Sequence, residues 1–225
     1  MKTFWPEINA TKPQRPIHDK AILWATQDKC GNLPNGDSNC FPSEMGAIVA
    51  RKHADQPHPL AAFCEAVSQA QERVWVIDKF FLEPEENKGN RQQRIEQILS
   101  WIPDGILAND FKFLTKSHNT NGNKEVDKNL ARQFQDYAEY ISKFRQRGAN
   151  QFVIEVRFTL MQNFNYVHDR FAIIDDELWH FGATVGGFYS LVSAATRGWR
   201  ASDHGAEQFF KLAWDAKSQM GKSQK

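Results

Sequence analysis

The segment from His168 to Asp175, HDRFAIID, holds residue types at a spacing that suits phosphoryl chemistry. Side chains two apart share one face of a strand, so His168 and Arg170 are predicted to point the same way. An imidazole can attack phosphorus or transfer a proton, and a guanidinium keeps its charge and can bind two phosphate oxygens at once. Asp175 ends the predicted strand, where it either orients an imidazole or a cation or begins a turn with Asp176. The segment therefore predicts a phosphate-binding site.

Each of these residues also has an ordinary structural explanation. His168 can be a strand-end histidine, and Arg170 can form an ion pair with Asp169 or Asp175. A metal cluster of His168, Asp169, Asp175 and Asp176 is disfavoured, because alternation separates the first two and Arg170 would repel a cation. We expect neither a metal nor a cofactor.

The segments around the motif alternate between strand and helix patterns. Strands are predicted at residues 21–27, 73–82, 111–116, 151–160, 166–175 and 177–184, and helices at 59–72, 90–101, 124–147 and 206–216. This order predicts an α/β fold, a mixed β-sheet flanked by helices. We divide the chain into an N-terminal extension and loop region (1–57), one domain (58–218) and a disordered tail (219–225).

The motif His168-x-Arg170-x4-Asp175, followed by Gly182-Ala183-Thr184, resembles the phospholipase D superfamily signature, H-x-K-x4-D followed by G-S. The resemblance covers roughly residues 58–216. It looks like a branch in which Arg replaces Lys, and which includes bacterial proteins of defence-associated context. It implies a phospholipase D-like fold and a metal-independent phosphodiesterase.

In that family a histidine attacks phosphorus to form a phosphohistidine, and a second histidine protonates the leaving oxygen. The resemblance therefore implies that His168 is the nucleophile and that Arg170 and Asp175 belong to the catalytic motif. The chain holds one copy of the motif and no internal repeat. The mechanism thus implies a homodimer that places two copies of His168 face to face.

Two residues are further candidates for holding the phosphate. Ala183 stands where the family has Ser, so the adjacent Thr184 is the candidate hydroxyl, and the family's Asn falls at Val185. Lys116 ends a predicted strand. Asp78 and Lys79 end another, at the carboxyl edge where ligands of α/β sheets gather, and either can reach the site, although a capped strand end explains them equally well.

Two more residues are possible supporting members of the site. His180 alternates with Gly182 and Thr184 and can line the same pocket, with a satisfied core histidine as the alternative. Glu207 stands where the family often has a late carboxylate, but a Glu that opens a helix is also an ordinary charge–dipole placement.

Composition limits the partners. The net charge of +1 lacks the basic excess of a broad nucleic-acid binder, so a phosphate has to be held by a local site. No apolar run reaches the length of a transmembrane helix or of a signal peptide, and we expect a cytoplasmic protein. Cys30 and Cys40 bracket a loop and can pair or remain free thiols.

The function predicted from the sequence is a phospholipase D-like nuclease that acts as a homodimer on nucleic acid. The alternative is a catalytically degraded domain that binds phosphate-bearing ligands, either nucleic acid or a lipid headgroup, or a protein partner. In a larger assembly, the N-terminal region with the Cys30–Cys40 loop would dock that partner.

Overall fold

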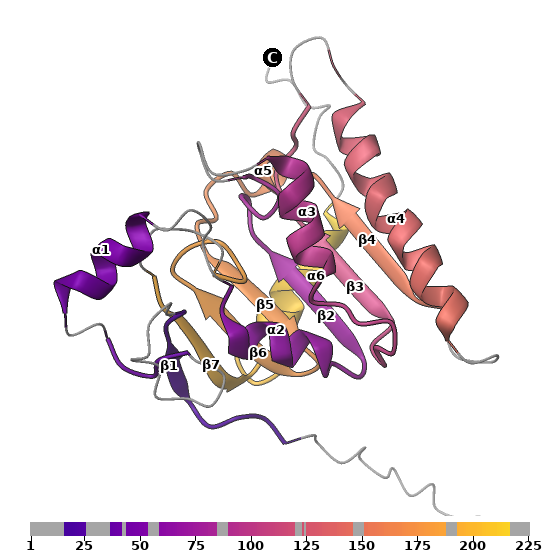
Figure 1. The fold of residues 1–225 in the computed structure, drawn as a ribbon. Coiled ribbons are helices and arrows are strands. Elements are labelled where there is room, and N and C mark those ends of the chain that lie inside the picture. The colour runs from indigo at the N-terminus through magenta and orange to yellow at the C-terminus, as the bar shows by residue number, and fades with distance from the viewer. Residues whose placement is uncertain are drawn as a thin grey trace, which may run out of the picture.

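The strands of the described chain form one mixed, seven-stranded sheet (Figure 1). The structure is a computed structural model and describes residues 16–25, 37–41, 44–53, 59–84, 90–119, 123, 125–145, 151–187 and 193–216. The strands are β1 (Ala21–Leu23), β2 (Arg73–Ile77), β3 (Asp110–Leu114), β4 (Val153–Arg157), β5 (Arg170–Ile174), β6 (Glu177–Phe181) and β7 (Ala195–Arg200). Their order is β1-β7-β6-β5-β2-β3-β4. The predicted α/β fold with a mixed sheet is confirmed.

The sheet has a parallel half and an antiparallel half. β2, β3 and β4 run parallel, whereas β5 runs antiparallel to β2 and is followed by the antiparallel neighbours β6, β7 and β1. The start of β5 therefore lies at the same edge as the carboxyl ends of β2 and β3. In this register Ile77, the last residue of β2, pairs with Phe171, the second residue of β5.

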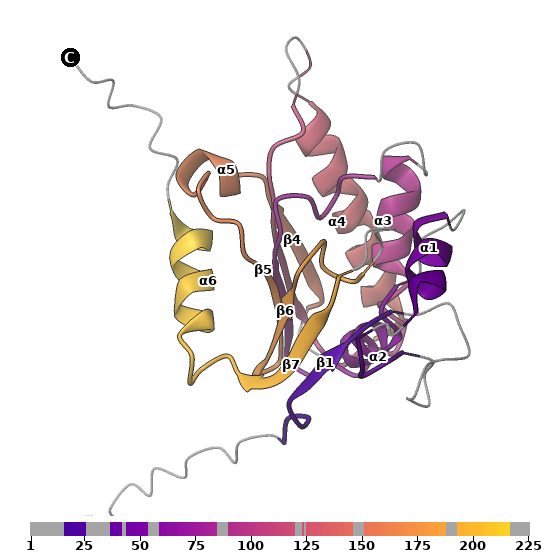
Figure 2. The same ribbon diagram turned by 90° about the vertical axis from the view of Figure 1, so that its left-hand side faces the viewer.

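Helices cover both faces of the sheet (Figure 2). α2 (Ala61–Ser68), α3 (Arg91–Leu99) and α4 (Val126–Phe144) pack on one face, and α6 (Ala206–Asp215) packs on the other. A short helix, α5 (Leu160–Asn163), follows β4.

Alternation along β5 supplies both cores. Ala172 and Ile174 join the core beneath α2, α3 and α4, while Phe171 and Ile173 join the core beneath α6. Arg170 therefore belongs to the first of these two faces.

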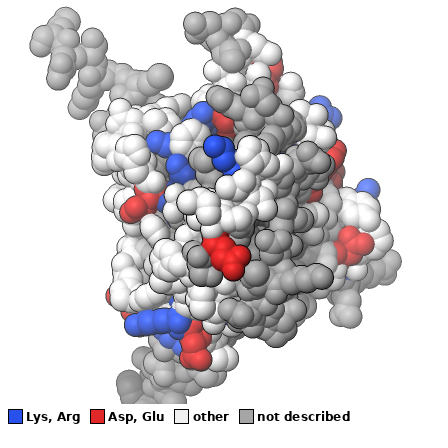
Figure 3. Space-filling view, turned by 60° about the vertical axis from the view of Figure 1, so that its left-hand side comes forward, with Lys and Arg blue, Asp and Glu red and all other residues white. Residues whose placement is uncertain are grey.

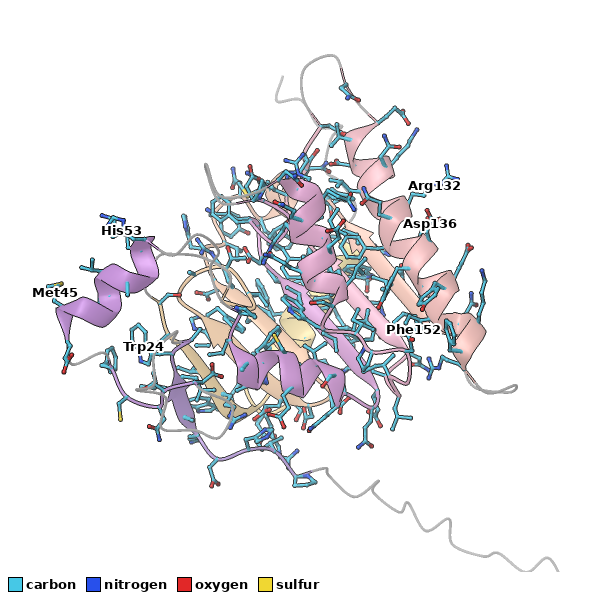
Figure 4. The ribbon with its side chains drawn as sticks, viewed as in Figure 1. Trp24, Met45, His53, Arg132, Asp136 and Phe152 are labelled. Carbon is cyan, nitrogen blue, oxygen red and sulfur yellow. The ribbon has the colours of Figure 1, made fainter. Side chains whose placement is uncertain are left out.

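α4 shows how the sequence pattern specifies a surface helix. Leu130, Phe134 and Ile141 are buried along one side, at the spacing of a helical stripe. Arg132 and Asp136 point outward from the other side, as Figure 4 shows, and form an exposed ion pair at 4.0 Å.

Most of the predicted strands end earlier than expected, and for two of them the residues that follow show why. The strand predicted for 73–82 stops at Ile77, because the Asp78 carboxylate accepts a hydrogen bond from the Phe80 backbone N–H and turns the chain. The strand predicted for 177–184 ends at Phe181, and the residues after it form a buried turn.

The strand predicted for 166–175 begins only at Arg170, so His168 precedes β5 and the predicted shared strand face does not include it. The strand predicted for 151–160 spans Val153–Arg157 and is followed by α5, which the sequence did not predict.

Besides α5, two more elements, α1 (Met45–His53) and β7, were not predicted. α1 stands clear of the sheet, with Met45 and His53 at its two ends (Figure 4). β7 pairs with β1, so residues 21–23, assigned above to the N-terminal extension, are part of the same sheet. The proposed tail at 219–225 and Cys30 lie outside the described residues, while Cys40 is exposed.

Candidate phosphate-binding site

Arg170 opens β5 at the edge where β2 and β3 end. Its side chain is 22% exposed, and its Nε lies 3.9 Å from an oxygen of Asp78. That Nε is buried and has no hydrogen-bond partner within the described residues. The guanidinium carbon lies 4.9 Å from the centre of the Phe80 ring. Arg170 is thus positioned by a carboxylate and an aromatic ring, with its Nε buried and only the exposed 22% of its side chain accessible to a ligand.

Asp78 is a fully buried carboxylate at the centre of this edge. It accepts hydrogen bonds from the backbone N–H of Phe80 at 2.8 Å and of Val185 at 2.9 Å. Burial raises its pKa, against the opposing effects of these hydrogen bonds and of the charges of Arg170 and Arg94. Asp78 therefore joins three separate segments of the chain, the end of β2, the start of β5 and the turn after β6.

The turn after β6, residues 182–187, is held firmly from several sides. Arg94 of α3, itself 3% exposed, donates from Nε to the Phe81 carbonyl at 2.8 Å and from Nη2 to the Val185 carbonyl at 3.2 Å. The Gly186 carbonyl accepts from the backbone N–H of Leu60 at 2.9 Å. These hydrogen bonds consequently fix the position of the turn beside Asp78.

Thr184 lies within this turn, below the surface. It is 1% exposed, and its hydroxyl has no hydrogen-bond partner within the described part of the chain. A phosphate bound at the surface does not reach a hydroxyl buried to this extent. The structure therefore does not place Thr184 where the sequence expected a phosphate ligand.

Two lysines share the Phe80 ring with Arg170. The Nζ of Lys79 lies 4.9 Å and the Nζ of Lys116 lies 5.1 Å from the ring centre. Lys116 also forms an ion pair with Glu83 at 2.9 Å. Lys and Arg side chains gather in the upper half of the face drawn in Figure 3. Phe80 thus organises three cations at the carboxyl edge of the sheet, which we call the Phe80 cation cluster (Lys79, Lys116 and Arg170).

His168 is exposed and lies two residues before Arg170 in the segment that leads into β5. No hydrogen bond or ion pair links its ring to another described residue. Its imidazole is therefore open to solvent, as a nucleophile must be in a protein that has not yet bound its substrate.

His180 is exposed rather than part of the core. Its side chain is 48% exposed, and its Nε2 lies 3.6 Å from Asp169. His180 pairs with Phe171 across β5 and β6, on the α6 face of the sheet. The alternative of a satisfied core histidine is thus wrong, and His180 lies on the face opposite to Arg170.

Asp175 and Glu207 lie at the far end of β5 from Arg170. The Asp175 carboxylate accepts from the backbone N–H groups of Gln71, Glu72 and Arg73 at 3.2, 2.7 and 3.2 Å. Glu207 accepts from Arg73 Nη2 at 2.8 Å, and this bond, aided by Lys211, lowers the pKa of Glu207 to about 2. The motif therefore spans β5, with His168 and Arg170 at one end of the strand and Asp175 and Glu207 at the other.

The sequence analysis missed Phe80, Arg94 and His118. His118 is buried next to Glu83, at 3.4 Å, and beside Arg91 at 3.3 Å, and burial with the charge of Arg91 lowers its pKa to about 4. No sequence signal marks a buried Arg or His, because only contacts between distant segments bury them.

Within the described residues, no group of three or more His, Cys, Asp or Glu side chains is placed to hold a metal ion. In the same part of the chain, no helix is long and apolar enough to cross a membrane.

Comparison with known proteins shows likeness in fold alone. No protein-family model matches the chain, and no curated protein matches it. Two solved structures are similar. Phosphatidylserine synthase of Haemophilus influenzae Rd KW20 has 15% identity and a TM-score of 0.40, over 68% of this chain and 33% of that one. TrmBL2, an archaeal chromatin protein described with a novel mode of DNA binding, has 12% identity and a TM-score of 0.36.

The TrmBL2 match covers 68% of this chain and 47% of that chain. The chain thus spans between a third and a half of the length of these proteins. Likeness at these scores carries no argument about activity.

Proposed function

We propose that this chain is a phospholipase D-like phosphodiesterase that cleaves nucleic acid without a metal ion. The observation that carries the proposal is the pair of cations Arg170 and Lys116 over the Phe80 ring, together with an exposed His168. Arg170 follows His168 by two residues, and its side chain is 22% exposed. A positioned guanidinium and an accessible imidazole are groups that can bind a phosphoryl group and attack it.

In the proposed reaction, a ring nitrogen of His168 attacks phosphorus and forms a P–N bond. The bond from phosphorus to the leaving oxygen breaks, and a protonated histidine supplies the proton to that oxygen. Water then attacks phosphorus, gives its proton to the second histidine, and releases His168. Arg170 and Lys116 neutralise the phosphoryl oxygens in both steps.

The second histidine is proposed to be His168 of another copy of the chain. His180 does not take this role, because it lies on the opposite face of the sheet from Arg170. We therefore propose a homodimer in which two carboxyl edges face each other. Light scattering across a range of protein concentrations tests this, and a monomer that retains full activity contradicts it.

The test of the function is digestion of single- and double-stranded DNA and RNA in the presence of a chelator. We expect wild type to cleave at least one substrate and His168→Ala to lose cleavage. His180→Ala is the matched control, since it removes an exposed histidine from the other face. Activity that disappears in chelator and returns with magnesium contradicts the proposal, as does equal activity of wild type and His168→Ala.

A second candidate function is binding of phosphate-bearing ligands without cleavage. The buried hydroxyl of Thr184 favours it, because the site then lacks a hydroxyl ligand for the phosphoryl oxygens. Tight binding of oligonucleotides or of anionic lipid headgroups with no turnover of any substrate supports this candidate. A protein partner at the N-terminal region is tested by deleting residues 1–15, which leaves β1 and its pairing with β7 in place.

A further inference from the structure

We propose that Lys79 binds a second phosphate, adjacent to the one held by Arg170. The ligand of this edge is then a strand of consecutive phosphodiesters rather than a molecule with a single phosphodiester. The inference rests on the proposed function and deepens it by naming the substrate class. It assigns to Lys79 a specificity role that the motif does not include.

The geometry places Lys79 close to Arg170 but not on the motif. The Lys79 Nζ and the Arg170 Cζ each lie 4.9 Å from the centre of the Phe80 ring, so they cannot be more than twice that distance apart. Like charges repel, so cations held by one ring are spread around it rather than stacked at one point. A spread of this kind suits neighbouring phosphates of one strand.

The ion pairs show which cation is left for the second phosphate. Lys116 is paired with Glu83 at 2.9 Å, and Arg170 faces Asp78 at 3.9 Å. Lys79 has no carboxylate partner among the described residues. Its charge is therefore the one that the protein itself neutralises least.

The backbone under Lys79 is fixed, so its amine is presented from a rigid base. The Lys79 carbonyl accepts a hydrogen bond from the Thr115 hydroxyl at 3.3 Å. The next residue, Phe80, donates its backbone N–H to Asp78 at 2.8 Å. A preorganised lysine loses less freedom when it binds a phosphate than one on a mobile loop.

The local charge also fits a polyanion, although the whole chain carries only +1. Around Asp78, Glu83 and Asp127, the edge collects five cationic side chains, namely Lys79, Arg91, Arg94, Lys116 and Arg170. One phosphodiester neutralises only part of that excess. Successive phosphates of a strand neutralise more of it and release more counterions.

The experiment measures binding, so that it does not depend on cleavage. Unlabelled thymidine dinucleotide, with one phosphodiester, and trinucleotide, with two, are titrated into the full-length His168→Ala protein and followed by NMR or calorimetry. We expect the trinucleotide to bind about fivefold to tenfold more tightly than the dinucleotide. Adding Lys79→Gln should abolish that ratio and leave dinucleotide binding unchanged.

Two controls accompany the variant. Lys79→Arg keeps the charge and should keep the ratio, while Lys128→Gln removes an exposed lysine of α4 and should change neither affinity. With a longer single strand, Lys79→Gln should lower the slope of log K against log salt by about 0.7, the value for one phosphate contact. An unchanged amide spectrum verifies that each variant is folded.

Each outcome separates this inference from the proposed function. The inference is overturned if the protein with Lys79 intact binds the trinucleotide and the dinucleotide with equal affinity. It is also overturned if Lys79→Gln lowers the affinity for both ligands equally. Either result holds even if the enzyme cleaves nucleic acid. A ratio that depends on Lys79 supports the inference even if no cleavage is found, and in that case the cleavage proposal alone fails. Failure to bind either ligand overturns the inference, while the digestion assay on longer strands decides the cleavage proposal separately.

Discussion

Replacing Asp175 should lower stability without changing chemistry, although Asp175 is the last residue of the motif. Its carboxylate accepts three backbone N–H groups, from Gln71, Glu72 and Arg73, and the bond to Glu72 is the shortest at 2.7 Å. It also occupies a left-handed conformation, with φ of 54°. Asp and Asn tolerate that conformation better than Ala does.

The magnitude follows from these contacts. Hydrogen bonds to a charged acceptor are worth about 1.5–3 kcal/mol each, but here three donors share one carboxylate and the segment 71–72 is exposed to water. We therefore expect Asp175→Ala to lower the free energy of unfolding by about 2–4 kcal/mol, including about 1 kcal/mol of backbone strain. Asp175→Asn retains an acceptor oxygen and should cost about 1 kcal/mol.

The assay pairs thermal unfolding with nucleic-acid cleavage measured well below the transition. For a chain of this size, a loss of 2–4 kcal/mol should lower the Tm by about 5–15 °C. Asp136→Ala, an exposed acid of α4, is the matched control and should shift the Tm little. If Asp175→Ala kept its Tm but lost cleavage or oligonucleotide binding, the assignment of a structural role would be refuted.

Three other substitutions test the electrostatics of the fold. Because the pKa of Glu207 is lowered to about 2, the contribution of its carboxylate to the free energy of unfolding is present above pH 4.5 and is lost as the pH falls towards 2. Urea unfolding should show that Glu207→Gln lowers the free energy of unfolding by about 1–2 kcal/mol at pH 7 and by nothing near pH 2. The pKa of His118 is lowered from 6.5 to about 4, so the free energy of unfolding should decrease as the pH drops from 6.5 to 4. Denaturation at pH 6.5 and at pH 4.5 should show a smaller decrease in His118→Gln than in wild type. Arg94→Met leaves the Phe81 and Val185 carbonyls without their donor and should destabilise the chain by about 2–4 kcal/mol, whereas a midpoint unchanged in urea would show that the turn after β6 is held by other contacts.

The elements that the sequence predicted are those with a clear period. β3 and β5 read as buried strands because apolar residues fill both cores, and α4 reads as a helix because its buried stripe recurs at helical spacing. β7 was missed because its sequence, ATRGWR, shows no apolar period. Arg197 there lies over the ring of Trp179, 5.3 Å from its centre, so a charged side chain takes part in packing.

The candidate site was predictable only where it is local in sequence. The pair His168 and Arg170 can be found from spacing alone. The placement of Asp78 beside Arg170 cannot, because it requires β5 to lie antiparallel to β2, which is a property of the whole sheet. For the same reason the sequence could name Lys116 but could not show that Phe80 gathers it with Lys79 and Arg170.

The spacing of the motif acquires a physical meaning from the strand that it spans. His168 and Arg170 stand at the start of β5, at the open carboxyl edge with its excess of cations. Asp175 follows its end, where it binds the backbone that leads into β2. Four strand residues, 171–174, separate Arg170 from Asp175, so one short segment both presents the guanidinium and fixes the position of the strand that carries it. This division predicts that substitution of His168 changes binding at constant stability and that substitution of Asp175 does the reverse, whereas substitution of Arg170 affects both, because the Asp78 carboxylate beside it is fully buried.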